Sequence, residues 1–143
     1  MNGSCQCGAI TFTTPTPQPT LLFHCHCIDC RKQSSSAFGT SAIFPFFALP
    51  SSPTLAVFQR ACDSGRKQNC YFCSRCGCRI LHAHIIEEEG KNPEVVAVKA
   101  GSLDGELDWI SAKHIFCRTA VVTIPDGVDR WEAEPDFKGR AKK

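Results

Sequence analysis

Seven of the eleven cysteines lie in three short clusters whose spacing is typical of metal ligands. The clusters are Cys5-Gln6-Cys7, Cys25-His26-Cys27-Ile28-Asp29-Cys30 and Cys73-Ser74-Arg75-Cys76. A closed structural zinc site takes four protein ligands, whereas a catalytic zinc site takes three and leaves one position for water or substrate. Four plus three accounts for all seven thiols, so the sequence predicts a zinc enzyme with two zinc ions per chain.

The first and third clusters are expected to share the structural zinc. In an extended segment, Cys5 and Cys7 would project their sulfurs to the same face. Cys73 and Cys76 are spaced for a turn, and Gly77 is available for a left-handed backbone conformation just after it. Because the two halves lie far apart in the sequence, this zinc would close a long loop and contribute to folding.

The central cluster is expected to hold the catalytic zinc through Cys25, Cys27 and Cys30. Its strand-like first half and turn-like second half supply three sulfurs from one short segment. His24 and His26 would project to the opposite face of an extended segment, which makes them packed histidines rather than direct ligands. Three thiolates would leave the zinc site with a net negative charge, unless hydrogen bonds to the sulfurs offset it.

Composition and charge limit the classes of function. The chain has 143 residues, is 43% hydrophobic and carries a formal net charge of +2. This charge is too small to favour a nucleic-acid partner, and no apolar run approaches the roughly 20 residues that a membrane span needs. We expect one domain over residues 1–137, a basic disordered tail over 138–143, and a cytoplasmic location in which thiols stay reduced. The sequence leaves open whether the protein forms a homo-oligomer.

The elements that must position the clusters are mostly strands. Short segments rich in β-branched and aromatic residues predict strands, and Pro- and Gly-rich segments separate them. The expected strands are 9–13, 21–25, 40–44, 55–58, 95–98 and 119–124. Helix is expected only as a turn around 31–33. The fold class is therefore mainly β, with antiparallel sheets.

Five segments of the chain resemble one known family. They are 3–12 around Cys5 and Cys7, 25–32 around the central cluster, 72–77 around Cys73 and Cys76, 100–104, and 113–116. In content and order they are similar to the successive signatures of the glutathione-dependent formaldehyde-activating enzymes. The resemblance implies a β-tent of antiparallel sheets stapled by the structural zinc, and the same division of the seven ligands.

The resemblance also implies an activity. Members of this family add glutathione to formaldehyde, giving S-hydroxymethylglutathione, so we expect a carbon–sulfur lyase with glutathione as a co-substrate. One proton must be moved during this addition, and His26, Asp29 and His114 are the candidate carriers. Arg31 and Lys32 are candidates for binding the carboxylates of glutathione.

Two other functions remain open on the sequence. The first alternative is a zinc enzyme of the same fold that acts on another small carbonyl metabolite without glutathione. The second is a noncatalytic zinc-stabilised binding module. The three-cysteine cluster argues against the binding module, because a scaffold needs only the four-cysteine site.

Overall fold

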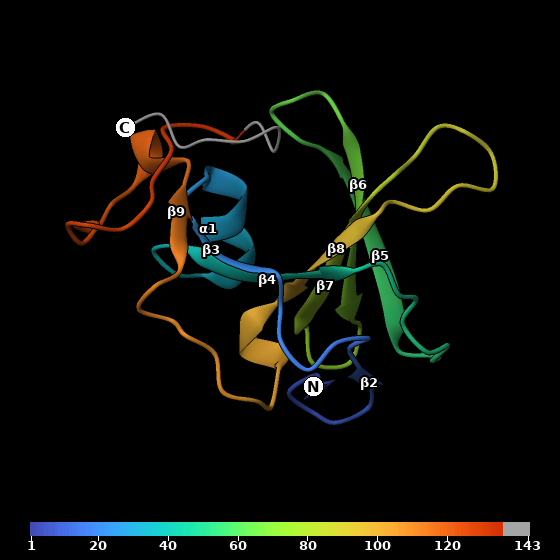
Figure 1. Ribbon diagram of the computed structural model, residues 1–143. Coiled ribbons are helices and arrows are strands. Elements are labelled where there is room, and N and C mark those ends of the chain that lie inside the picture. Colours follow the sequence, from blue (N-terminus) through green and yellow to red (C-terminus); the bar gives the residue numbers. More distant parts are fainter. Residues whose placement is uncertain (136–143) are drawn as a thin grey trace. The chain divides into compact units, whose positions relative to one another are not determined.

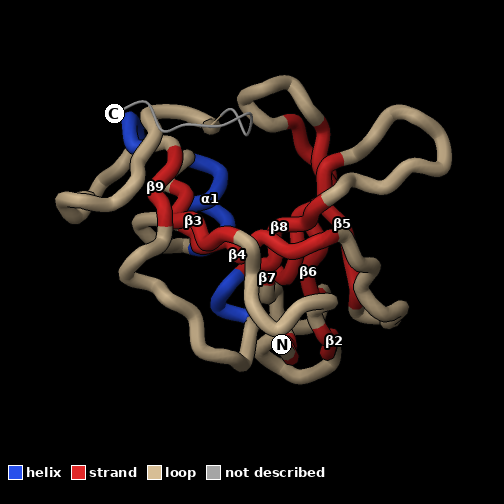
Figure 2. Tube along the Cα trace, in the orientation of Figure 1, coloured by secondary structure: helices blue, strands red, loops and turns tan. Residues whose placement is uncertain are grey.

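The computed structural model describes residues 1–135 and is mainly β, with 36% strand and 10% helix. The expected tail at 138–143 lies outside the described residues. The elements are β1 (Asn2–Ser4), β2 (Thr11–Thr13), β3 (Leu21–Cys25), α1 (Ile28–Ser34), β4 (Gly39–Pro45), β5 (Leu55–Ala61), β6 (Lys67–Cys73), β7 (Arg79–His84), β8 (Val95–Lys99) and β9 (Lys113–Ile115), with 3-10 turns at Ala100–Ser102 and Cys117–Thr119. In the described residues, helix is confined to these short segments (Figure 2).

The chain divides into two compact units. Unit 1 comprises Met1–Thr20 and Ala42–Leu107, and unit 2 comprises Leu21–Ser41 together with the residues from Asp108 onward. Strand β4 begins in unit 2 and continues into unit 1. Each unit contains one of the two cysteine sets, so each is described by itself.

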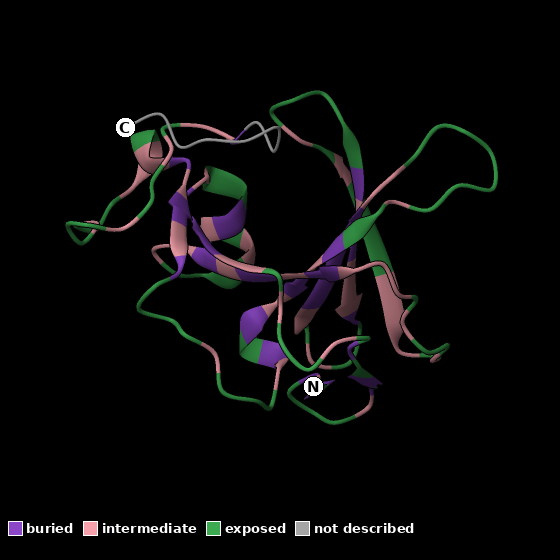
Figure 3. Cartoon of the chain, in the orientation of Figure 1, coloured by how far each residue is buried: buried purple, intermediate pink, exposed green. Residues whose placement is uncertain are grey.

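Unit 1 is built from antiparallel ladders. Strand β1 pairs with β2, and β5, β6, β7 and β8 follow one another across a sheet, side by side in Figure 1. The β5–β6 hairpin closes at a turn in which Gly65 has a φ of 80° and donates its N–H to the Cys62 carbonyl at 2.9 Å. Burial is deepest in β6, β7 and β8, whereas β5 at the edge contains no buried residue (Figure 3).

Unit 2 differs from the antiparallel expectation at one ladder. Strands β3 and β9 pair in parallel, with His24 opposite His114 and Cys25 opposite Ile115. The expected strand at 119–124 is wrong: a 3-10 turn occupies Cys117–Thr119 and bends follow it. Val121 and Val122 are exposed, so the apolar pattern of that segment does not correspond to burial.

No helix among the described residues is long and apolar enough to cross a membrane.

Candidate metal centres

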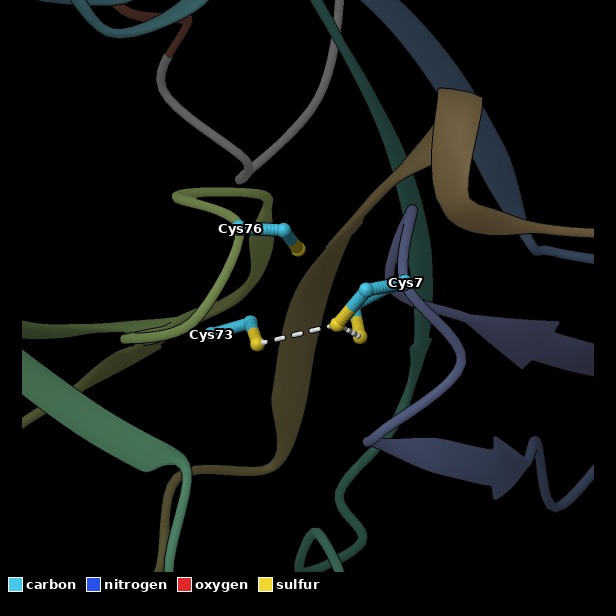
Figure 4. Close-up of side chains that lie close together, drawn as sticks. Cys7, Cys73 and Cys76 are labelled. Atoms are coloured by element: carbon cyan, nitrogen blue, oxygen red, sulfur yellow. Dashed lines mark hydrogen bonds between the residues drawn. The ribbon is translucent and has the colours of Figure 1, made fainter.

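Four cysteines, Cys5, Cys7, Cys73 and Cys76, converge in unit 1 from two turns, and Figure 4 labels the last three. The sequence suggested an extended segment for Cys5 and Cys7. Both residues lie instead in the turn after β1. That turn closes by a 3.0 Å hydrogen bond from the N–H of Gly8 to the Cys5 carbonyl. The second turn follows β6 and closes by a 2.8 Å hydrogen bond from the N–H of Gly77 to the Cys73 carbonyl.

Both turns end on a glycine in the left-handed region. Gly8 has a φ of 72° and Gly77 has a φ of 74°, a conformation that a residue with a Cβ adopts only at a cost. The expectation for Gly77 is therefore confirmed, and Gly8 repeats the same device. Each glycine lets the chain reverse immediately after a sulfur, so two sulfurs from one turn can face the same point.

The spacing of these sulfurs fits a tetrahedral zinc ion. The four Sγ atoms lie within 4.8 Å of one another, with 3.6 Å between Cys5 and Cys7 and 3.8 Å between Cys7 and Cys73. Sulfurs bound tetrahedrally at about 2.3 Å from zinc are about 3.8 Å apart. The donor set and its geometry therefore suit zinc in a closed four-sulfur site.

Backbone N–H groups favour the thiolate form at this set. The N–H of Ile10 donates to Cys5 Sγ at 3.3 Å. Cys76 has a pKa lowered to about 6, first by the backbone N–H of Cys78, whereas burial and hydrogen bonds with the neighbouring sulfurs raise the pKa of Cys7 to about 11. Because the metal binds the thiolate, the backbone N–H groups favour metal binding at Cys76 and Cys5, and a bound cation would favour the thiolate of Cys7 as well.

Three further cysteines converge in unit 2 where β3 ends and α1 begins. The Sγ atoms of Cys25, Cys27 and Cys30 lie within 4.8 Å of one another. Cys25 is the last residue of β3, Cys27 is the N-cap of α1, and Cys30 lies in the first turn of the helix. One sulfur of the cluster also caps the helix: Cys27 Sγ accepts a hydrogen bond from the N–H of Cys30 at 3.3 Å.

Hydrogen bonds to sulfur offset part of the negative charge expected here. Gln33 Nε2 donates a hydrogen bond to Cys30 Sγ at 3.6 Å, and the N–H of Cys30 donates one to Cys27 Sγ. The sulfurs of Cys27 and Cys30, together with burial, raise the pKa of the Cys25 thiol. Three thiolates this close together, on two buried residues and one half-buried residue, are thus unfavourable without a cation among them, and a bound divalent metal would reverse that preference.

The polypeptide around this set is apolar and locally strained. Phe116 is buried against Cys25 and Cys30, and Ile115 packs on the same cluster. Phe116 has a φ of 58°, which is uncommon for an aromatic residue and costs of order 1 kcal/mol or more. This backbone conformation brings Phe116 against Cys25 and Cys30 at the point where the chain leaves β9 for the 3-10 turn.

The histidines lie on the opposite face of β3 from Cys25. His26 Nε2 and His114 Nδ1 are 2.9 Å apart, and both His24 and His26 contact the ring of Phe38. His24 Nε2 donates to the Trp109 carbonyl at 3.0 Å, and the Thr40 hydroxyl donates to Nδ1 at 2.8 Å. Neither histidine next to the cysteines therefore belongs to the three-sulfur group, as the alternation of side chains predicted.

These three imidazoles are neutral at neutral pH. Burial lowers the pKa values of His24 and His26, and burial with the nearby His24 and His26 lowers the pKa of His114 to about 4. Neutral imidazoles suit packing, and only His26 Nδ1 in this cluster is buried without a hydrogen-bond partner among the described residues. As a result, the structure brings His26 and His114 together but not with the cysteine sulfurs.

The charged candidates lie on α1. Asp29 and Lys32 are exposed, and Arg31 is half-buried with its Nη1 donating to the Thr119 carbonyl at 3.4 Å. Arg31 is therefore held in place, and it is near enough to His26 to lower that pKa. Sequence reasoning missed Gln33, although its position one helical turn after Cys30 is a usable signal, because side chains at i and i+3 are neighbours.

Comparison with known proteins agrees with the family signatures. A family model described as "Glutathione-dependent formaldehyde-activating enzyme" matches residues 1–119, most of the chain. A protein of Halomonas elongata named "Putative glutathione-dependent formaldehyde-activating enzyme" is 26% identical over 114 residues, which cover 75% of this chain and 68% of that protein.

Proposed function

Because the chain belongs to the glutathione-dependent formaldehyde-activating enzyme family, we propose that it is a zinc-dependent carbon–sulfur lyase that acts on a thiol and a small aldehyde. Glutathione and formaldehyde are the first substrates to test. The proposal places two zinc ions on each chain, one structural and one catalytic. It also places the protein in a reducing compartment such as the cytoplasm, where the thiols stay available for metal.

The division of the cysteines is the observation that carries this proposal. Four sulfurs in unit 1 form a group with the spacing of a closed tetrahedral site, and three sulfurs in unit 2 form a second group. A zinc ion held by three protein ligands keeps a position for substrate, where it would act as a Lewis acid toward a thiol sulfur or a carbonyl oxygen.

The protein residues around the three sulfurs have separate roles in this proposal. Gln33 and the Cys30 N–H withdraw charge from two sulfurs, which preserves Lewis acidity. Phe116 and Ile115 give the cluster an apolar side that limits water. Arg31, fixed by the Thr119 carbonyl, offers a guanidinium group for a substrate carboxylate.

The route of the proton follows from the faces of β3. His26 and His114 are buried and bonded to each other on the face away from Cys25, whereas Asp29 is exposed in the first turn of α1. We therefore assign proton transfer to Asp29 or to solvent rather than to the histidines.

The test combines metal content with turnover. Protein purified without chelator is analysed for zinc, and the exchange between glutathione and S-hydroxymethylglutathione is followed by NMR in the presence of formaldehyde. Two zinc ions per chain and accelerated exchange would support the proposal. Two zinc ions without acceleration would move the substrate to another carbonyl compound, and one zinc ion without acceleration would favour the binding module.

A further inference from the structure

One face of the sheet in unit 1 gathers basic side chains from β5, β7 and β8. Directly paired residues on neighbouring strands share a face. One row across the sheet is Arg60, Gln68 and His84, and the next row is Phe58, Cys70, His82 and Ala97. Lys99, two residues beyond Ala97 on β8, shares this face by alternation.

Arg79 joins the same face through a bulge. The register of β6 and β7 shifts between Tyr71 and Phe72, which leaves Phe72 opposite Arg79. The Arg79 guanidinium carbon lies 5.5 Å from the centre of the Phe72 ring and 5.9 Å from that of Phe58. The two rings hold the guanidinium over the face by cation–π contact.

Arg79 Nη1 and His82 Nε2, both on β7, are buried and have no hydrogen-bond partner among the described residues. His82 is only 5% exposed, and a buried polar atom without a partner is costly, which makes each such atom in a native protein an indication of a missing ligand or water. Both atoms lie on the face that carries Arg60 and Lys99.

The electrostatic surroundings of His82 are positive. After burial, the influences that lower its pKa are Lys99, Arg79, Arg60 and His84, in that order. Gln68 is uncharged and does not neutralise them; with its amide oxygen turned toward Arg60, it accepts hydrogen bonds from Arg60 Nε at 3.2 Å and Nη2 at 2.8 Å. Cations gathered around the partly buried Arg79 donor favour a negatively charged ligand.

We propose that the β5–β8 face of unit 1 binds a small oxyanion, a carboxylate or a phosphate, between Arg79 and His82. The planar guanidinium of Arg79 matches the two oxygens of either group, and Arg60 and Lys99 add positive charge beside it. A ligand can reach the site, because Phe58 is 53% exposed and Arg79 is only half-buried. This inference does not depend on the proposed activity or on metal content.

The test measures binding without turnover. Isothermal titration calorimetry on the full chain, in a buffer without oxyanions, uses inorganic phosphate, succinate and glutathione as separate probes, with sodium chloride as the control for ionic strength. We expect saturable binding of at least one probe. Arg79→Gln should weaken it about tenfold or more, because a charge-assisted hydrogen bond is lost.

A matched control separates the site from general charge. Arg66→Gln removes the same charge from the exposed β5–β6 turn of unit 1 and should leave affinity unchanged. Arg79→Lys keeps the charge but loses the paired N–H donors of the guanidinium, so this variant should bind with intermediate affinity. If Arg79→Gln does not fold, NMR titration of the wild type should still shift the side-chain signals of Arg79 and His82 and not those of Arg66.

The relative affinities identify the source of the oxyanion. Tighter binding of phosphate than of succinate would indicate a phosphate ligand, and tighter binding of glutathione or succinate would indicate an organic carboxylate. The absence of saturable binding by all three probes at millimolar concentrations would overturn the inference. Wild-type affinity in folded Arg79→Gln would overturn it equally.

Discussion

Replacing Cys73 with serine should remove the metal-linked closure between the two turns of unit 1. Cys73 is completely buried, and its sulfur lies 3.8 Å from that of Cys7, 66 residues earlier in the chain. Treated as a cross-link, closure of a loop of that length removes unfolded-chain entropy equivalent to about 4 kcal/mol at 25 °C. The total stability of a typical domain is only about 5–15 kcal/mol, so the loss should be severe.

The assay compares zinc content and unfolding in three proteins. We expect Cys73→Ser to lose one zinc ion per chain and to unfold at lower denaturant, or to be insoluble when expressed. The matched control is Cys78→Ser, which changes a half-buried thiol near the same set but outside the four-sulfur group. This control should keep two zinc ions and change the free energy of unfolding by no more than about 1 kcal/mol.

The opposite result would refute the reasoning. If folded Cys73→Ser keeps both zinc ions and the stability of the wild type, the four sulfurs of unit 1 do not form a structural metal site. Loss of zinc with unchanged stability would keep the metal site but contradict its role in folding.

Four further predictions concern single residues in both units. Cys27→Ser should stay folded, lose one zinc ion and lose turnover, measured by zinc analysis and exchange NMR. Gln33→Ala should keep that zinc and reduce turnover about tenfold, because one hydrogen bond to Cys30 Sγ is removed. Gly3→Ala should lower the free energy of unfolding by about 1–3 kcal/mol, since a Cβ there would lie 2.7 Å from a backbone carbonyl oxygen and 2.5 Å from an aromatic carbon. Burial, with neighbouring cations, lowers the pKa of His82 well below its usual value. The unfolded chain therefore binds the extra proton first as pH falls below about 6.5, and stability should decrease with falling pH by more in the wild type than in His82→Gln.

Each of these predictions has a contradicting outcome. Unfolding of Cys27→Ser would reverse the assignment of the two metal sites, and full turnover in Gln33→Ala would remove its role at the sulfur. Wild-type stability in Gly3→Ala would show that the backbone there moves freely. Identical acid profiles for the wild type and His82→Gln, measured in a buffer without oxyanions, would show that His82 titrates normally in the folded chain.

Local sequence predicted the parts of this protein that depend on spacing. The convergence of Cys25, Cys27 and Cys30, the turn glycine Gly77 and strand β3 follow the predictions, because each depends on residues only a few positions apart. The placement of His24 and His26 away from Cys25 also followed from the alternation of an extended chain. The sequence by itself thus determined the local sets of sulfurs, whereas the meeting of Cys5 and Cys7 with Cys73 and Cys76 requires the tertiary structure.

Tertiary structure decided everything that depends on pairing between distant segments. The apolar segment 119–124 forms no strand, whereas β6 begins with polar residues and β9 is only three residues long, and both are strands. Strand identity here depends on which neighbour is available for hydrogen bonding, which composition does not specify. The basic face of unit 1 exists for the same reason: Arg60, His82 and Lys99 come from three strands, and only the register of the ladders brings them to one side of the sheet.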